Sequence, residues 1–354
     1  MDRFRPVCPP LPERVRRIVA ATGNAARTSN QRIASIVCNQ IALIFSDVGL
    51  PNLSDSVCRR QAMAYLNACP LPATSAISAL TPVVNLARLR VRGGAPDEGL
   101  LQITSLYEAV ENGRPALIAG ITVPDSLVAS PPDREEVLAW LRKTILADGS
   151  RIFTNSGRWS EARALVESHR GMNDRMLDGR QIAVLASLAS GADSAARALV
   201  ESTHPGEPWE QDVTSCLSAL CSGTGHLPAD HPVVLMAENM QHTEVTPGKA
   251  VFHARIGLTV LDICGTAYPV ARLVLDDLDR WAATAVDGNV ARECQAHHRF
   301  RELASTRQLQ RCADTVRACG LGVGSMPSAL QADLSDCLNT AIEVIRSNTL
   351  LPHA

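Results

Sequence analysis

The sequence has 354 residues, of which 46% are hydrophobic and 20% charged, and its formal net charge is −2. This length and apolar content exclude a disordered tail and predict either two domains or one elongated array. The near-neutral charge excludes a general electrostatic attraction to nucleic acid or to an anionic membrane.

The composition favours helices, because aromatic residues make up only 3% of the chain and strands draw more heavily on them. Arginine replaces lysine almost everywhere, and Lys143 and Lys249 are the only lysines. That bias is typical of a GC-rich genome such as that of an actinobacterium. The N-terminal residues contain no apolar signal segment, and no run of 18 apolar residues occurs, so we expect a cytoplasmic protein with no membrane partner.

The eleven cysteines are an odd number and form no Cys-x-x-Cys pair. A structural zinc site needs closely spaced ligand pairs, and a secreted disulfide framework would be shorter and more regular. We therefore expect the cysteines to be small buried hydrophobic residues.

In chain order, residues 1–27 are predicted to form an N-terminal cap or arm. Apolar residues then recur at helical spacing from Ile33 to Ile44 and predict a first helix. A turn is expected at residues 49–52, followed by a second helix over residues 54–67 with Ser54 or Asp55 as its N-cap. Pro70 and Pro72 end this helix.

The same order of helix, glycine turn and helix returns along the chain, with a further helix expected over residues 97–110. The candidate turn glycines are Gly49, Gly94, Gly157, Gly191, Gly225 and Gly265. Their spacing is 45 residues for the first pair, 34 for each of the two intervals after Gly157, and 40 for the last. Internal periods of this size indicate repeats of helical hairpins.

Two of the segments after a glycine are similar in sequence, "GRWSEARALVESHR" from Gly157 and "GADSAARALVESTH" from Gly191. Both place an alanine, Ala162 or Ala196, where a small residue lets the second helix approach its partner closely. In these features the chain resembles the tetratricopeptide-repeat family. The resemblance implies an all-α fold, a right-handed superhelical stack of helical hairpins over residues 28–285, with residues 286–354 as a C-terminal helical cap.

Residues 112–136 interrupt the helical pattern and predict a long loop with a short extended piece. Long loops within compact chains are uncommon and often functional. The alternative is an insertion that covers the flank of the array.

The repeat register singles out three polar positions. Asn39 lies ten residues before Gly49, Asn85 nine before Gly94, and Asp148 nine before Gly157. In peptide-binding members of the family that the chain resembles, an Asn near this position faces a concave groove and holds the backbone of the ligand. The resemblance thus implies a binding groove lined by Asn39, Asn85 and Asp148, with Arg88 and Arg92 beside Asn85. The alternative is that each Asn bonds a neighbouring loop.

Other polar clusters in the sequence do not predict a binding or catalytic site. The acidic run Asp276-Asp277-Leu278-Asp279 is interpreted as a solvated helix face paired with Arg272 and Arg280. His297 and His298, taken as neighbours on one helix, would point about 100° apart and could not share a metal ion. No phosphate-binding loop, nucleophile motif or basic DNA-reading helix is present in the sequence.

The sequence therefore predicts a non-catalytic, cytoplasmic scaffold or regulatory module that binds a protein or peptide in a concave groove. It predicts no catalytic residue, no metal, no cofactor and no direct nucleic-acid contact. Assembly into a homo-oligomer is left as an alternative. The alternative is an all-helical biosynthetic enzyme with an enclosed pocket and no readable motif.

Overall fold

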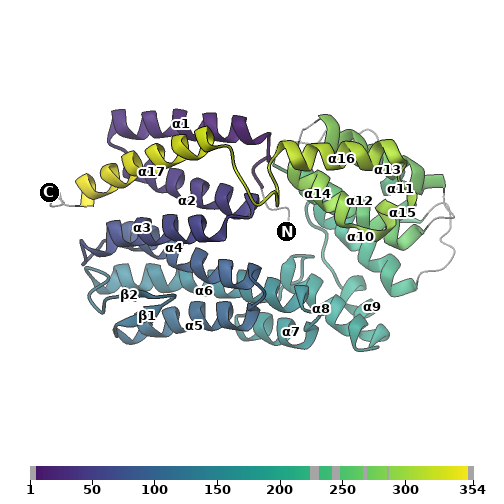
Figure 1. Ribbon diagram of the computed structural model, residues 1–354. Helices are drawn as coiled ribbons and strands as arrows, with labels where there is room; N and C mark the ends of the chain where they lie inside the picture. Colours follow the sequence, from purple (N-terminus) through teal and green to yellow (C-terminus); the bar gives the residue numbers. More distant parts are fainter. Residues whose placement is uncertain (1–4, 224–230, 241–247, 266–268, 285–286, 350–354) are drawn as a thin grey trace. The chain divides into compact units, whose positions relative to one another are not determined.

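The computed structural model describes residues 5–223, 231–240, 248–265, 269–284 and 287–349. Within them the chain forms seventeen helices and one two-stranded hairpin, so the predicted all-α class is confirmed (Figure 1). The turn expected at Gly225 lies outside the described residues.

The chain divides into two compact units. The first unit joins Pro12–Ser156 to Gly322–Ala354, and the second joins Met1–Leu11 to Gly157–Leu321. Each unit is therefore built from two segments that lie far apart in the sequence, and each contains one end of the chain. The predicted division into a cap, an array and a second cap stays a prediction.

The first unit is a stack of helices in which neighbours along the chain are neighbours in space. Its helices are α1 (Leu11–Thr28), α2 (Gln31–Val48), α3 (Pro51–Leu66), α4 (Ala73–Arg92), α5 (Pro96–Asn112), α6 (Pro131–Asn155) and α17 (Ser328–Thr349). From α2 to α6 each helix packs against the next (Figure 1). This is the helical-repeat organisation that the glycine spacing predicts.

The last helix of the chain packs on the first hairpin. Helix α17 contacts both α2 and α3, and the Gln31 side chain of α2 donates to the Ile345 carbonyl of α17 over 3.3 Å. On its other side Thr22 of α1 hydrogen-bonds Cys337 of α17. Helix α17 thus lies between α1 and α2, although it is far from both in sequence (Figure 1).

Helix α3 begins earlier than the predicted residue 54. Pro51 occupies its first turn, where a missing N–H costs nothing, and Leu50 is the N-cap residue. The predicted cap at Ser54 or Asp55 is therefore wrong. Ser54 lies inside the helix, buried, and its hydroxyl donates to the Ala42 carbonyl of α2 over 2.8 Å.

The turn glycines adopt the backbone conformation that hairpin turns demand. The predicted glycines that are described all have positive φ, between 64° and 93°: Gly49, Gly94, Gly157, Gly191 and Gly265. A residue with a Cβ rarely adopts this conformation, so each glycine ends a helix at a sharp turn.

The predicted loop at residues 112–136 is shorter in the structure, because α5 extends to Asn112 and α6 begins at Pro131, but it contains the predicted extended piece. Strands β1 (Ala116–Ile118) and β2 (Ile121–Val123) form an antiparallel hairpin whose two turn residues, Ala119 and Gly120, both have positive φ. Farther on, Leu71 donates to the Leu127 carbonyl and accepts from the Ala129 amide. The insertion is thereby fixed to the connection between α3 and α4.

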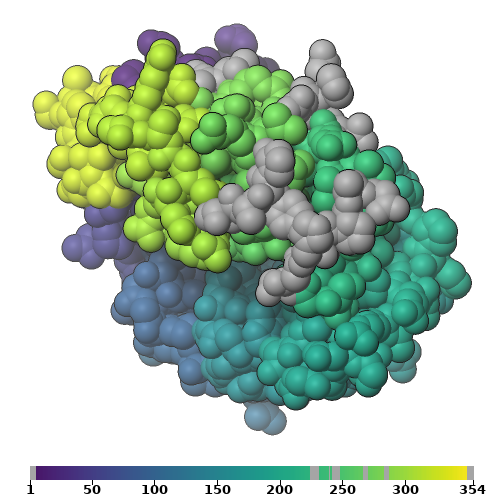
Figure 2. Space-filling view, turned by 90° about the vertical axis from the view of Figure 1, so that its right-hand side faces the viewer, coloured from purple at the N-terminus to yellow at the C-terminus, as the bar shows by residue number. Residues whose placement is uncertain are grey.

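The second unit contains the remaining helices: α7 (Trp159–Ser168), α8 (Asp178–Ala189), α9 (Asp193–Glu201), α10 (Pro208–Ser222), α11 (Pro232–Met240), α12 (Ala250–Cys264), α13 (Pro269–Thr284), α14 (Gly288–Ala296), α15 (His298–Leu303) and α16 (Thr306–Ala318). Helices α7 to α10 pack in chain order, and α12 contacts α10, α13, α14 and α15. Figure 2 shows the outer face that parts of these segments form, coloured from teal to yellow-green. Near the N-terminus, Cys8 joins this unit through hydrogen bonds to Asp287 and Gly288.

The two alanines predicted at the helix contacts, Ala162 in α7 and Ala196 in α9, are fully buried. Ala196 lies in an apolar cluster with Met176, Val184 and Leu217. A methyl side chain at Ala196 lets the two helices of the hairpin α8–α9 approach closely, as the repeat pattern predicts.

Replacing Ala196 with Leu should lower the free energy of unfolding by about 1–3 kcal/mol, because the larger side chain has no room in this cluster. Ala198 lies on the same helix and is exposed, so Ala198→Leu is the matched control and should change stability by less than about 0.5 kcal/mol. Urea unfolding followed by circular dichroism measures both. Equal effects of the two substitutions would contradict the close approach of α8 and α9.

Candidate functional site

The structure brings the predicted groove residues together in one hydrogen-bonded row across α2, α4 and α6. The Asn85 side-chain amide donates to Asn39 Oδ1 over 2.7 Å, and Arg88 Nη1 donates to Asn85 Oδ1 over 3.0 Å. Arg88 Nε in turn donates to Asp148 Oδ2 over 2.9 Å. Together with Arg92, these residues are called the polar row below. That they bind a ligand stays a prediction.

The hydrogen bonds of the polar row also show how α2 and α4 are aligned. Asn85 bonds Asn39, and Arg92 donates to the hydroxyl of Ser46, so both contacts join residues 46 positions apart. The two contacts lie seven residues, or two helical turns, apart along each helix. Helices α2 and α4 therefore run parallel and in register, as the first helices of successive hairpins should.

Asp148 is the buried end of the row, with only 5% of its surface exposed. One carboxylate oxygen accepts from Arg88 Nε, with Arg88 Nη2 at 2.8 Å, and the other accepts from Arg151 Nη1 over 3.1 Å. A buried carboxylate is stable only when charged donors replace its lost hydration. Asp148 therefore positions Arg88, and Arg88 in turn orients Asn85.

The exposed end of the row carries an excess of positive charge. Arg88 and Arg151 contact the Asp148 carboxylate and Arg92 bonds Ser46, so three guanidinium groups stand against one carboxylate and the charges sum to +3 − 1 = +2. The Arg92 side chain is exposed, and the Asn39 amide nitrogen donates to no described residue. The row can therefore offer N–H donors and positive charge to an acceptor.

Sequence reasoning missed two members of this site, Ser46 and Arg151. Ser46 lies seven residues after Asn39 on the same face of α2, and Arg151 lies three residues after Asp148 on α6. Helical spacing from the predicted residues could have found both.

The acidic run on α13 is not a solvated helix face. Only Asp276 is exposed, whereas Asp277 and Asp279 are 4% and 9% exposed. Arg280 donates to Asp277, and Arg311 of α16 donates to Asp279. The predicted solvated face is wrong for Asp277 and Asp279, because α16 packs against α13.

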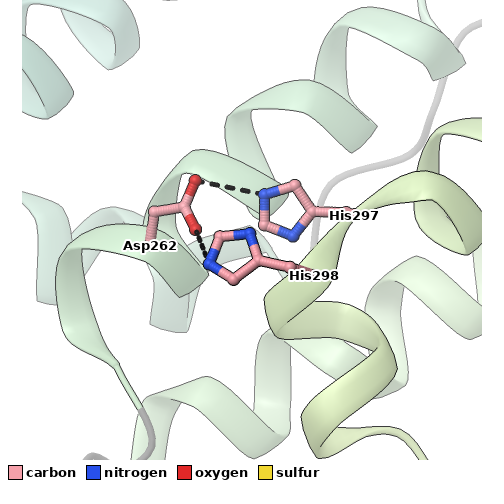
Figure 3. A group of neighbouring side chains, drawn as sticks. All are labelled: Asp262, His297 and His298. Atoms are coloured by element: carbon pink, nitrogen blue, oxygen red, sulfur yellow. Dashed lines mark hydrogen bonds and ion pairs between the residues drawn. The ribbon is translucent and has the colours of Figure 1, made fainter.

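The two adjacent histidines do not share a helix. Helix α14 ends at Ala296 and α15 begins at His298, while His297 between them is extended, with φ −80° and ψ 127°. The argument that the two rings point about 100° apart therefore fails. Their rings lie 5.1 Å apart and both face Asp262 of α12 (Figure 3).

The cysteines are small buried residues, as predicted, except that Cys69 is partly exposed. Burial raises the pKa of Cys38, Cys58 and Cys216 to about 12 and that of Cys69 to about 11. A thiol must lose its proton to act as a nucleophile. These four thiols are therefore unreactive at neutral pH.

Comparison with protein families, with curated proteins and with solved structures finds no match to this chain. No described helix is long and apolar enough to cross a membrane.

The contact between Arg88 and Asp148 should show in a double-mutant cycle. Asp148→Ala should lower the free energy of unfolding by about 1–3 kcal/mol because it removes the partner of two guanidinium groups. The coupling with Arg88→Ala should be about 1 kcal/mol, since Arg88 is 40% exposed and partly screened. The exposed pair Glu13 and Arg17 on α1 is the control, with an expected coupling below about 0.5 kcal/mol. A coupling no larger than this control would show that the row is not formed in solution.

Alkylation should report the burial of the thiols. In the native protein iodoacetamide should label Cys69 first, and the labelling rate should rise about tenfold per pH unit from pH 8 to 10, because the thiolate fraction grows until the pH reaches the pKa. Mass spectrometry of timed samples measures the rate, and Cys69→Ser should abolish the first label. Labelling of the buried cysteines at an equal rate would contradict the structure.

Proposed function

We propose that this protein is a non-catalytic scaffold or regulatory module of the cytoplasm that binds a protein or peptide partner along the polar row. In this proposal α2, α4 and α6 are the inner helices of a right-handed, tetratricopeptide-like superhelix and line its concave groove. The observation that carries the proposal is the hydrogen bonding of Asn39, Asn85, Arg88 and Asp148 across three successive hairpins.

The charge of the row favours an acidic ligand. A guanidinium group can bind a carboxylate through two parallel hydrogen bonds, and Arg92 is the exposed guanidinium of the row. The amide nitrogen of Asn39 can donate to a backbone carbonyl next to it. The ligand that fits both donors is an extended peptide with an acidic side chain or a C-terminal carboxylate.

The buried end of the row serves this binding by holding the donors in place. Asp148 fixes Arg88, and Arg88 fixes the Asn85 amide, so fewer side-chain rotamers remain to be ordered when a ligand arrives. Groups that are ordered before binding contribute more affinity per contact.

One observation favours the alternative, an all-helical enzyme. In the second unit Asp277 Oδ2, Asp279 Oδ1 and the indole N–H of Trp281 are buried and have no hydrogen-bond partner among the described residues. Unsatisfied buried polar groups are rare in native proteins and occur at ligand sites. A polar small molecule bound in this unit could satisfy them.

A peptide library displayed on phage and selected on the full-length chain tests the proposed function. Selected peptides should be acidic, and Arg92→Ala should weaken their binding about tenfold, as loss of a charge-assisted hydrogen bond of about 1.5 kcal/mol requires. Arg90 lies in the same last turn of α4 and pairs loosely with Glu98 at 3.8 Å. Arg90→Ala is therefore the matched control and should change the affinity by less than about twofold. Fluorescence anisotropy measures each dissociation constant.

Selection of no peptide, or equal losses for Arg90→Ala and Arg92→Ala, would overturn the proposal for the polar row. Native mass spectrometry of the chain from its own cell extract addresses the enzyme. A bound small molecule that is lost in Asp279→Asn but retained in Arg92→Ala would favour the enzyme.

A further inference from the structure

Three metal-ligating side chains meet in the second unit, away from the polar row. Asp262 lies near the end of α12, and His297 and His298 lie at the joint between α14 and α15. His297 Nε2 is 3.1 Å from Asp262 Oδ2, and His298 Nε2 is 3.7 Å from Asp262 Oδ1. Figure 3 shows one ring at each oxygen of the carboxylate.

The extended backbone at His297 creates this arrangement. On a continuous helix the two rings would diverge, but the break between α14 and α15 turns both toward α12. Helix α12 contacts both α14 and α15, so the packing of this unit holds the carboxylate opposite the joint.

The spacing of the ligand atoms suits a small divalent cation. One ligand atom from each of the three residues can be chosen so that all lie within 4.8 Å of one another. A tetrahedral zinc ion bound at about 2.0–2.1 Å holds its ligand atoms about 3.3–3.4 Å apart. The two histidine nitrogens lie 3.1 and 3.7 Å from the two different oxygens of the Asp262 carboxylate, close to this value, so side-chain rotations can bring one oxygen to both nitrogens.

The charge environment also permits a cation. Among the described residues, the charged or ionisable groups that contact the Asp262 carboxylate are the two histidines, and no arginine or lysine occupies it. Imidazole nitrogen and carboxylate oxygen are ligands that zinc accepts readily.

We propose that Asp262, His297 and His298 bind a divalent transition-metal ion, with zinc as the best fit. The three protein ligands leave a fourth position open to water, because His298 is 65% and Asp262 43% exposed. The ion ties α12 to the joint between α14 and α15.

Binding changes one local hydrogen bond. His297 Nδ1 accepts from the Phe300 amide at 3.4 Å, the long contact that caps α15. An ion on Nε2 places the ring proton on Nδ1, so this contact is given up. At 3.4 Å the contact is weak and its loss costs little.

Zinc binding to the full-length chain tests the site. The protein, kept reduced and freed of metal, is dialysed against zinc, and the bound zinc is counted per chain. Wild type should bind one zinc ion at this site, and His298→Ala or Asp262→Ala should weaken its binding at least tenfold. His298 is exposed and caps no helix, so its replacement leaves the fold intact.

The matched control is a second exposed pair of histidine and carboxylate in the same unit. His204 Nδ1 lies 3.9 Å from Asp174 Oδ2, and no third metal ligand lies beside them in the part of the chain that the structure describes, so His204→Ala should bind zinc like wild type. Asp262→Asn, which keeps the shape of the side chain, is a second site variant whose zinc binding is measured in the same way.

Cobalt binding gives a second measurement of the ligand set. With cobalt in place of zinc, the visible spectrum should show tetrahedral bands without a thiolate charge-transfer band.

Three outcomes would overturn the proposal. The first is that wild type binds no zinc. The second is that His298→Ala and Asp262→Asn bind zinc as tightly as His204→Ala does. The third is that the cobalt spectrum shows cysteine ligands. Loss of zinc in the site variants alone supports it.

Discussion

The fold depends on close contact between helices that have few large side chains to pack. Aromatic residues are only 3% of the chain, so burial of apolar surface relies on alanine, valine and leucine at short helix separations. Fully buried alanines occur in both units, among them Ala34, Ala76, Ala162 and Ala196. At Gly99 of α5 even a methyl group would come within 2.5 Å of the Val91 side chain of α4. Such contacts leave little freedom in how far apart neighbouring helices can lie.

This constraint explains why the polar row forms. Since α2 and α4 each pack closely against α3, the first helices of two successive hairpins are brought into parallel register. Positions 46 residues apart then face each other, and side chains such as Asn39 and Asn85 meet without any further local cause. The packing of the repeats thus brings these positions together, and the polar side chains at them form the hydrogen bonds of the row.

Local rules made much of the fold predictable. Turn glycines, helical spacing and the insertion are short-range features, and the structure has the described turn glycines and the extended piece where they were predicted. The loop around the extended piece ends earlier than predicted, because Ser130 caps α6 and Pro131 begins it. The members of the polar row followed from counting back from the turns, because a helix converts sequence distance into direction. The N-cap of α3 was missed because Pro51 permits a helix start that the Ser54 and Asp55 pattern hides.

Long-range packing was out of reach of the same reasoning. No residue near Asp277 and Asp279 in the sequence indicates that α16 covers them, and their charge alone predicts that both side chains are exposed. The docking of α17 on α2 joins residues as far apart as Gln31 and Ile345. The break at His297 is likewise hidden, since a helix that ends without glycine or proline leaves no strong signal in its sequence.

The polar row is also best understood as a device for register. An all-apolar contact between α2, α4 and α6 would tolerate sliding by a turn, because methyl groups and leucines pack almost equally well at several offsets. A buried carboxylate does not, since a shift of one turn would leave Asp148 without its donors and cost the full desolvation of that group. The half-buried amides of Asn39 and Asn85 would lose their hydrogen bond in the same shift. The same hydrogen bonds that hold Arg88 ready for a ligand thus select one alignment of the helices. Substitutions in the row should therefore change binding and stability together, whereas Arg92, at its exposed end, should change binding alone.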